Sequence, residues 1–286
     1  MNQIIVNGLM LGMSYALIAL GLTLIFGIMN IVNFAHGQMY MVGGFIVYYF
    51  YGIFGWNYFL ALFMCVVILG ALGVIFERFF FRRFMRYSSR AESSMLLAIG
   101  TALLLENIAL LAFGEKHRGV PPLFEDIKNI FGVYIPTTRI LIFFISLALI
   151  IALLLFIKYS RHGLAMQALA QDREVTHLMG VNTNRVSMMG FGIGAALAGV
   201  AGGLLALVFP VFSGSGGIIS IKSFIMIMIG GAGVVPGAII GGFLLGMLES
   251  IGYGLIPGSV TYLLIFLAVI LLLIFRPLGI MGKPGY

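Results

Sequence analysis

The sequence predicts an all-α, polytopic membrane protein with about eight or nine membrane segments, some of them broken or re-entrant. Of its 286 residues, 62% are hydrophobic and 9% are charged, and the mean hydropathy is +1.15, whereas soluble domains usually carry about 25% charged residues. Apolar residues also fill both faces of long runs such as 140–157, ILIFFISLALIIALLLFI, which is typical of membrane helices and not of alternating barrel strands. These observations exclude a soluble globular domain.

The membrane segments follow from a length rule, because roughly 20 apolar residues cross a hydrocarbon core of about 30 Å. We treat residues 1–286 as a single transmembrane domain, and the seventh segment is short enough to be re-entrant. All charged residues lie from Glu77 onward, so the first three segments carry none. The predicted segments are 4–28, 37–54, 58–76, 94–113, 140–157, 186–209, 218–229, 235–251 and 260–275.

Lysines and arginines set the predicted topology, since they accumulate in cytoplasmic loops. The loop 78–90 carries five arginines, and the loop 158–185 carries one lysine and three arginines. Both are therefore predicted to be cytoplasmic, and the loop 114–139, whose charges nearly balance, is predicted to face outward. A cytoplasmic C-terminal tail then requires three crossings after residue 218, or two if one piece is re-entrant. The net charge of +7 reflects this distribution and does not indicate a nucleic-acid partner.

The sequence does not indicate an enzyme. Its four histidines lie in different segments, and it contains neither an HExxH zinc motif nor a nucleophile elbow. The single cysteine has no partner for a disulfide or a cysteine metal site. A phosphate-binding P-loop motif is also absent. We therefore predict no catalytic residues, no metal site and no cofactor in this chain, so that any use of ATP would belong to a partner.

Four polar residues interrupt the apolar background between the first two segments: Asn30, Asn33, His36 and Gln38. Polar groups at membrane depth are costly and usually face a cavity or a partner helix. The segment is therefore either a broken helix that lines or supports a solute path, or an ordinary polar loop at the membrane surface. The residues alone leave both interpretations open.

Glycines are concentrated in two places. Between residues 190 and 203 they are interleaved with alanines, which lets helix backbones approach closely and predicts a packing face or, alternatively, a moving interface. A second group breaks the apolar pattern between the seventh and eighth segments, and it is predicted to be a hinge or pore element or else a plain tight turn. This group comprises Gly230, Gly231, Gly233, Pro236 and Gly237.

The loop 158–185 has the pattern of an amphipathic helix. Leu164, Leu169, Val175 and Leu178 recur at helical spacing, and Gly180 stands at a C-cap position. Two interpretations fit this pattern: a docking helix for a cytosolic partner, or a helix that lies on the inner leaflet.

Three ionisable residues lie inside or beside membrane segments: Glu106, Lys222 and Glu249. A charge at this depth costs at least about 2.5 kcal/mol on insertion scales, so each is a candidate functional residue. A pair between Lys222 and Glu249 would neutralise both. Such structural pairing agrees with the sequence at least as well as contact with a substrate does.

Four ordered blocks resemble the permease subunits of branched-chain amino acid ABC transporters, in particular the shorter of the two paralogous permeases. They are GLTLIFGIMNIVNFAHGQMYMVGGF (21–45), ALAQDREVTHLMGVNTNRV (168–186), GGAGVVPGAIIGGFLLG (230–246) and RPLGIMG (276–282). The resemblance covers nearly the whole chain. It implies half of an inner-membrane importer for branched-chain (hydrophobic) amino acids, paired within the lipid bilayer with a second, distinct permease. Two cytosolic ATPase subunits, which hold ATP and magnesium, would drive it, and an external solute-binding protein would feed it.

The same resemblance gives the loop 158–185 a role. Its coupling segment would sit in a groove of the ATPase, and Gly180 would match the glycine of the ABC permease loop motif. Asp172 stands where the general importer motif has its EAA opening, which is a departure from that motif. The implied coupling residues are Gln171, Asp172, Arg173, Glu174, Leu178, Met179 and Gly180.

The family blocks do not fix the solute, because similar permeases look adapted to urea or short amides. For a leucine-like zwitterion, Asn30, Asn33, His36 and Gln38 are the best candidates for polar contacts along the path. A different class, an ion- or proton-coupled secondary carrier, would rely on the three ionisable residues. The uncharged first 76 residues and the long amphipathic loop argue against that carrier.

Overall fold

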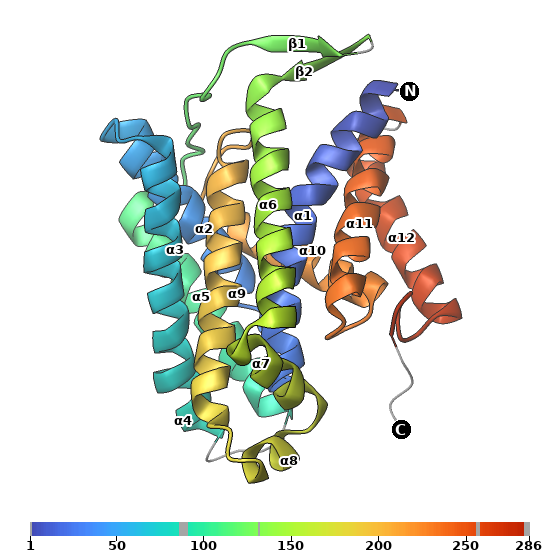
Figure 1. Ribbon diagram of the computed structural model, residues 1–286. Coiled ribbons are helices and arrows are strands. Elements are labelled where there is room, and N and C mark those ends of the chain that lie inside the picture. The colour runs from blue at the N-terminus through green and yellow to red at the C-terminus, as the bar shows by residue number, and fades with distance from the viewer. Residues whose placement is uncertain (1, 86–90, 131, 256–257, 283–286) are drawn as a thin grey trace.

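The computed structural model describes residues 2–85, 91–130, 132–255 and 258–282. In chain order its elements are α1 (Asn2–Met29), α2 (His36–Val47), the π-helix η1 (Tyr48–Ile53), α3 (Tyr58–Ile75), the π-helix η2 (Phe76–Phe81), α4 (Arg82–Met85), α5 (Ala91–Phe113), β1 (Ile127–Ile130), β2 (Val133–Pro136), α6 (Thr137–Tyr159), α7 (Arg161–Gln171), α8 (Arg173–Leu178), α9 (Thr183–Leu205), α10 (Ser215–Gly230), α11 (Val235–Leu255) and α12 (Gly258–Phe275). Figure 1 shows the long helices gathered into one bundle.

Each of the nine predicted membrane segments coincides with helical structure. Six helical stretches of the described chain are long and apolar enough to cross a membrane, and α10 and α12 are shorter apolar helices. The six are Asn2–Met29, Tyr58–Phe84, Ser93–Phe113, Thr137–Tyr159, Thr183–Leu205 and Val235–Leu255. The prediction of an all-α, polytopic membrane fold is therefore confirmed. The antiparallel hairpin β1–β2 in the loop 114–139 is an element that we did not predict.

The two ends of the bundle carry different loops, as the distribution of lysine and arginine predicts. At one end the side chain of Gln3 joins α1 to the hairpin: its Nε2 donates to the Tyr134 carbonyl at 2.9 Å, and its Oε1 accepts from the Tyr134 N–H at 3.1 Å. The helices α7 and α8 lie at the opposite end (Figure 1). Following the predicted topology, we call the end with the hairpin the outer end and the end with α7 and α8 the inner end.

The number of segments after residue 210 follows from the course of the chain. α9 ends toward the outer end, where Val211 and Arg118 exchange two backbone hydrogen bonds of 2.9 Å. α10 then leads toward the inner end, α11 returns, and α12 descends again (Figure 1). Beyond α12 the chain comes back to α10, because the Ile280 N–H donates to the Ile229 carbonyl at 2.8 Å. Three helices therefore follow α9, of which α11 is long and apolar enough to cross a membrane and α10 and α12 are shorter. The number of crossings stays a prediction.

Small residues bring the central helices into backbone contact. A Cβ atom on Gly21 of α1 would lie 2.7 Å from the Gly194 carbonyl oxygen of α9, and a Cβ atom on Gly194 would lie 2.6 Å from the Gly21 oxygen. On the other side of α1, a Cβ atom on Gly242 of α11 would lie 2.4 Å from the Ala16 nitrogen. Only glycine permits these approaches. The packing face predicted from the glycine-rich stretch is thus confirmed.

Candidate functional site

The polar segment 30–38 enters the bundle instead of remaining at its surface. α1 ends at Met29, and Asn30 is exposed with a left-handed φ of +51°. Six residues later, the Nε2 atom of His36 lies 3.1 Å from the carbonyl of Ile18, which is in the interior of α1. The chain therefore turns back along α1, and α2 begins well inside the bundle. This geometry agrees with the broken-helix interpretation and contradicts a surface loop.

α10 holds this broken segment in place. The Ser220 hydroxyl donates to the Phe34 carbonyl at 2.7 Å and accepts from the Gly37 N–H at 3.1 Å, which satisfies two backbone groups that no helix pairs. Asn33 stabilises the turn locally, because its Oδ1 accepts from the Ala35 N–H at 3.1 Å. The same α10 helix thereby fixes both the start of α2 and the turn before it.

The predicted path residues differ in exposure. Asn33, His36 and Gln38 are buried within this chain, with at most 1% of each exposed, whereas Asn30 is exposed. None of the four lines the cavity near the outer end, the pocket beside Gly180 or the pocket beside Lys222. The Gln38 Nε2 atom donates to Glu106 of α5 at 3.2 Å. Their part in a solute path stays a prediction, and the side chains of His36 and Gln38 join α2 to α1 and α5.

Lys222 and Glu249 form the predicted pair. The Lys222 ammonium lies 2.7 Å from Oε1 and 3.0 Å from Oε2 of Glu249, and it donates to the Tyr15 hydroxyl at 2.8 Å. The Tyr15 hydroxyl in turn donates to Glu249 Oε2 at 2.7 Å. The ring of Tyr262 also lies near the ammonium, with its centroid at 5.5 Å. The ammonium therefore donates to Tyr15 and to Glu249, and the cluster joins α1, α10 and α11.

The glycine break after α10 is a tight turn that the C-terminal segment covers. Gly231 has a φ of +110°, which favours glycine, and a Cβ atom there would lie 2.6 Å from the Gly282 nitrogen. The Met281 N–H donates to the Gly230 carbonyl at 3.0 Å, so the segment after α12 satisfies carbonyls at the end of α10. Pro236 lies in the first turn of α11. Whether this turn acts as a hinge stays a prediction.

The predicted coupling segment is helical, but it is not one helix. Gln171 is the last residue of α7, and Asp172 breaks the helix with extended backbone angles of φ −153° and ψ 118°. The Asp172 carboxylate then caps α8, accepting from the N–H groups of Glu174 at 2.8 Å and Val175 at 2.9 Å. The expectation of a continuous amphipathic helix is therefore wrong. Leu169 is buried, so it does not share the exposed face of Leu178.

α8 ends in the αL conformation predicted for Gly180. Its φ is +83°, its N–H donates to the His177 carbonyl at 3.0 Å, and the Val181 N–H donates to the Thr176 carbonyl at 3.3 Å, which is a Schellman cap. Leu178 and Met179 stand immediately before it, with 84% and 78% of their surfaces exposed. All seven predicted coupling residues are exposed. A short helix capped at both ends thus presents an apolar tip.

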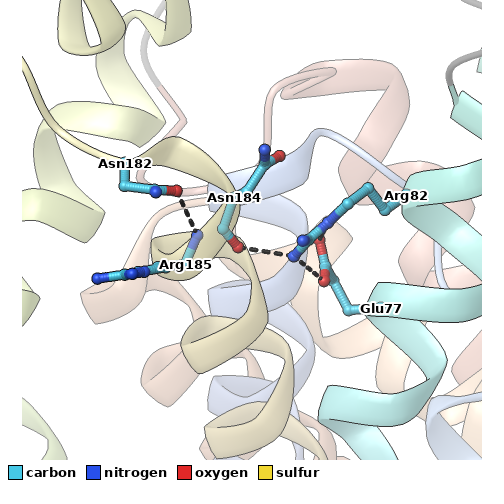
Figure 2. A network of polar contacts seen from close by, with 5 residues as sticks. All are labelled: Glu77, Arg82, Asn182, Asn184 and Arg185. Carbon is cyan, nitrogen blue, oxygen red and sulfur yellow. Dashed lines mark hydrogen bonds and ion pairs between the residues drawn. The ribbon is translucent and has the colours of Figure 1, made fainter.

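A polar network at the inner end joins α9 to the helix that follows α3. Figure 2 shows Arg82 extended between Glu77 and Asn184. The Arg82 Nε atom donates to Glu77 Oε1 at 3.1 Å, and its Nη2 atom donates to the Asn184 carbonyl at 2.9 Å. Asn182 caps the same end of α9, since its Oδ1 accepts from the Arg185 N–H at 3.1 Å. The base of the coupling segment is thereby tied to a second membrane helix.

Replacing Arg82 with glutamine is expected to destabilise the chain by about 1–3 kcal/mol, because Glu77, 2% exposed, loses its bidentate cation. The midpoint of thermal unfolding in detergent measures the effect. Arg83→Gln is the matched control, since Arg83 is the exposed neighbour. Equal midpoints for the two variants would contradict the role given to Arg82.

One site was missed by the sequence analysis. A cavity of about 320 Å³ near the outer end is lined by α1, α6, α11 and the end of α9. The Arg139 guanidinium lies in its wall and donates to Asn7 Oδ1 at 3.1 Å. Arg139 stands directly before the predicted fifth segment, but the sequence analysis counted it only among the charges of the loop 114–139. Among the described residues, no three His, Cys, Asp or Glu side chains gather as a metal site.

Comparison with known proteins gives matches over nearly the whole chain. The family model described as the permease component of the branched-chain amino acid transport system matches residues 4–275. The chain is 37% identical to the high-affinity branched-chain amino acid transport system permease protein BraD of Pseudomonas aeruginosa, over 99% of this chain and 96% of that protein. It is 35% identical to the permease protein LivH of Escherichia coli K12, over 97% of this chain and 94% of LivH.

A more distant match is the permease protein LivM of the same organism, at 25% identity over 68% of this chain and 51% of LivM. Both E. coli proteins carry the name of a high-affinity branched-chain amino acid transport system. No solved structure matches the chain. With a family model covering residues 4–275 and two relatives above 30% identity over nearly full length, this chain belongs to the permease components of branched-chain amino acid transport systems.

Proposed function

We propose that this chain is a permease subunit of an ATP-driven importer for branched-chain amino acids in the cytoplasmic membrane. It forms half of the translocation path and carries out no chemistry of its own. A second, distinct permease forms the other half, which agrees with the separate naming of LivH and LivM in one organism. Two ATPase subunits hold ATP and magnesium, and an external binding protein delivers the solute.

The observation that carries the proposal is the tip of α8. An isolated helix of six residues is not stable in water, yet α8 has a side-chain cap at its start and a Schellman cap at its end. Leu178 and Met179 at its tip are exposed, and a partner protein that covers them would remove this apolar surface from water. The tip lies at the inner end, where cytosolic ATPase subunits would bind.

Movement of α8 would reach the membrane helices by two routes. α8 leads directly into α9, whose glycines pack against α1, and Arg82 ties the first turn of α9 to the chain after α3. In this proposal, Asn33, His36 and Gln38 support the wall of the path by fixing the start of α2 against α1 and α10. The turn 230–237 is the corresponding hinge between α10 and α11.

Uptake into vesicles that contain the co-expressed complex tests the proposal. Labelled leucine is expected to enter only when ATP is present inside, labelled urea is expected not to enter, and Gly180→Glu is expected to abolish uptake because glutamate is strained at a φ of +83°. Entry of urea instead of leucine would contradict the proposed solute, while the proposed coupling to ATP would stand. Uptake that ignores ATP would support an ion-coupled secondary carrier.

A further inference from the structure

The cavity near the outer end has the size of a small-molecule site. Its volume is about 320 Å³, which is at the lower end of the range of about 300–1,000 Å³ for ligand pockets. It lies between the first half of α1 and the start of α6, close to the hairpin, and these elements meet at the outer end in Figure 1.

Arg139 gives the cavity a positive charge without a counter-ion. The ion pairs among the described side chains are Glu77–Arg82 and Lys222–Glu249, and neither involves Arg139. Its partner across the wall is the neutral amide of Asn7, which accepts one of the five guanidinium N–H donors. A guanidinium matches a carboxylate in shape and binds it through two parallel hydrogen bonds. The charge therefore favours an anionic group on the ligand.

The remaining wall is mostly apolar, with two hydroxyl groups. Leu11, Ile142 and Leu205 supply aliphatic surface from three different helices. The hydroxyls of Ser14 and Ser250 donate to backbone carbonyls of their surroundings, at 3.4 Å and 2.6 Å, so their oxygens keep lone pairs that accept from an ammonium. The cavity thus offers a cation, acceptors and an aliphatic surface together.

We propose that this cavity binds a zwitterionic aliphatic amino acid, with its carboxylate on the Arg139 guanidinium and its side chain against the aliphatic wall. This inference rests on the proposed function and deepens it, because it names where this chain recognises the solute. An anionic phospholipid would also offer a negative group to Arg139 and acyl chains to the apolar wall. The small zwitterion is favoured by the hydroxyl acceptors, which suit an ammonium.

The test measures binding of labelled leucine to the purified complete transporter in nanodiscs, without the external binding protein. Unlabelled leucine and leucine amide, which lacks the carboxylate, compete for the site. Arg139→Gln is expected to weaken leucine binding by about tenfold or more, and to abolish the preference for leucine over its amide. Lys128→Gln is the matched control, because it removes an exposed positive charge from the same end of the bundle.

A second variant tests the site without changing charge. Val208→Trp fills the cavity, and Ile151→Trp adds the same ring to α6 at a position outside the cavity that is 46% exposed. Only the first is expected to weaken leucine binding. The comparison of Val208→Trp with Ile151→Trp keeps the proposal testable if Arg139→Gln does not fold.

The outcomes separate the site from the function. If the wild-type complex imports leucine with ATP but folded Arg139→Gln and Val208→Trp both bind leucine normally, the site is overturned and the proposed function stands. If the wild-type complex neither binds nor imports leucine, both are overturned. If Arg139→Gln loses a co-purifying anionic phospholipid while its preference for leucine over the amide is unchanged, the cavity is a lipid site.

Discussion

Glu249→Gln is expected to destabilise the folded chain by about 3–5 kcal/mol, because it leaves the Lys222 ammonium buried without a counter-charge. The side chain of Lys222 is 12% exposed and that of Glu249 is 3% exposed. Glutamine also offers one acceptor oxygen where the carboxylate offers two, although both the Tyr15 hydroxyl and the Lys222 ammonium donate to Glu249. Three helices meet at this cluster, so the effect is expected to reach the whole bundle.

The measurement is the midpoint of unfolding in a denaturing-detergent titration. Glu125→Gln is the control, since it neutralises an exposed carboxylate in the outer loop. The double variant Lys222→Met with Glu249→Leu is expected to recover much of the lost stability, because apolar replacement of a buried pair is often neutral or stabilising. A double variant as unstable as the single one would contradict this account of the cluster.

The same double variant separates two functions. In the proposed importer, Lys222 and Glu249 only hold helices together, so the folded double variant is expected to retain ATP-dependent leucine uptake. A secondary carrier that uses these residues for ion coupling would lose transport completely. Complete loss of uptake in a folded double variant would therefore favour the carrier over the importer.

Hydropathy predicted the membrane helices because the bilayer leaves few alternatives: every backbone polar group must be paired within the segment. The nine predicted ranges follow from that constraint alone. The pairing of Lys222 with Glu249 could be predicted for a related reason, since two opposite charges at membrane depth are costly unless they meet. These predictions needed no knowledge of the tertiary arrangement.

The break at Asp172 could have been predicted and was not. Aspartate favours N-cap positions over helix interiors, and the following residues offer free N–H groups to its carboxylate. We predicted one amphipathic helix across Asp172 because the apolar spacing continued on both sides of it. The hairpin was missed similarly, although Gly132 supplies the positive φ of its turn and Asn129 accepts from the Gly132 N–H.

Other parts of the site depend on contacts between distant segments. Asn7 and Arg139 lie 132 positions apart, and Ser220 meets Phe34 across 186 positions. No local pattern in the sequence brings these residues together. The resemblance to a permease family placed the coupling segment at 171–180, but only the structure shows which side chains at its tip are exposed.

Leu178→Asp is expected to reduce ATP-dependent uptake by at least about tenfold, because it places a charge in the apolar contact that we propose between α8 and the ATPase. The chain itself should fold normally, since 84% of the Leu178 surface is exposed and the caps of α8 are unchanged. The measurements are leucine uptake and co-purification of the ATPase subunits, and both are expected to fall together.

Leu164→Asp distinguishes docking from adsorption to the membrane. Leu164 is 52% exposed and belongs to α7, the helix that precedes α8 in the same loop. If the loop lies on the inner leaflet, a charge at either leucine weakens its binding to the membrane surface, so the two variants should behave alike. If α8 docks through its tip, only Leu178→Asp should release the ATPase. Equal retention of the ATPase in both variants would therefore reject the tip of α8 as the coupling contact.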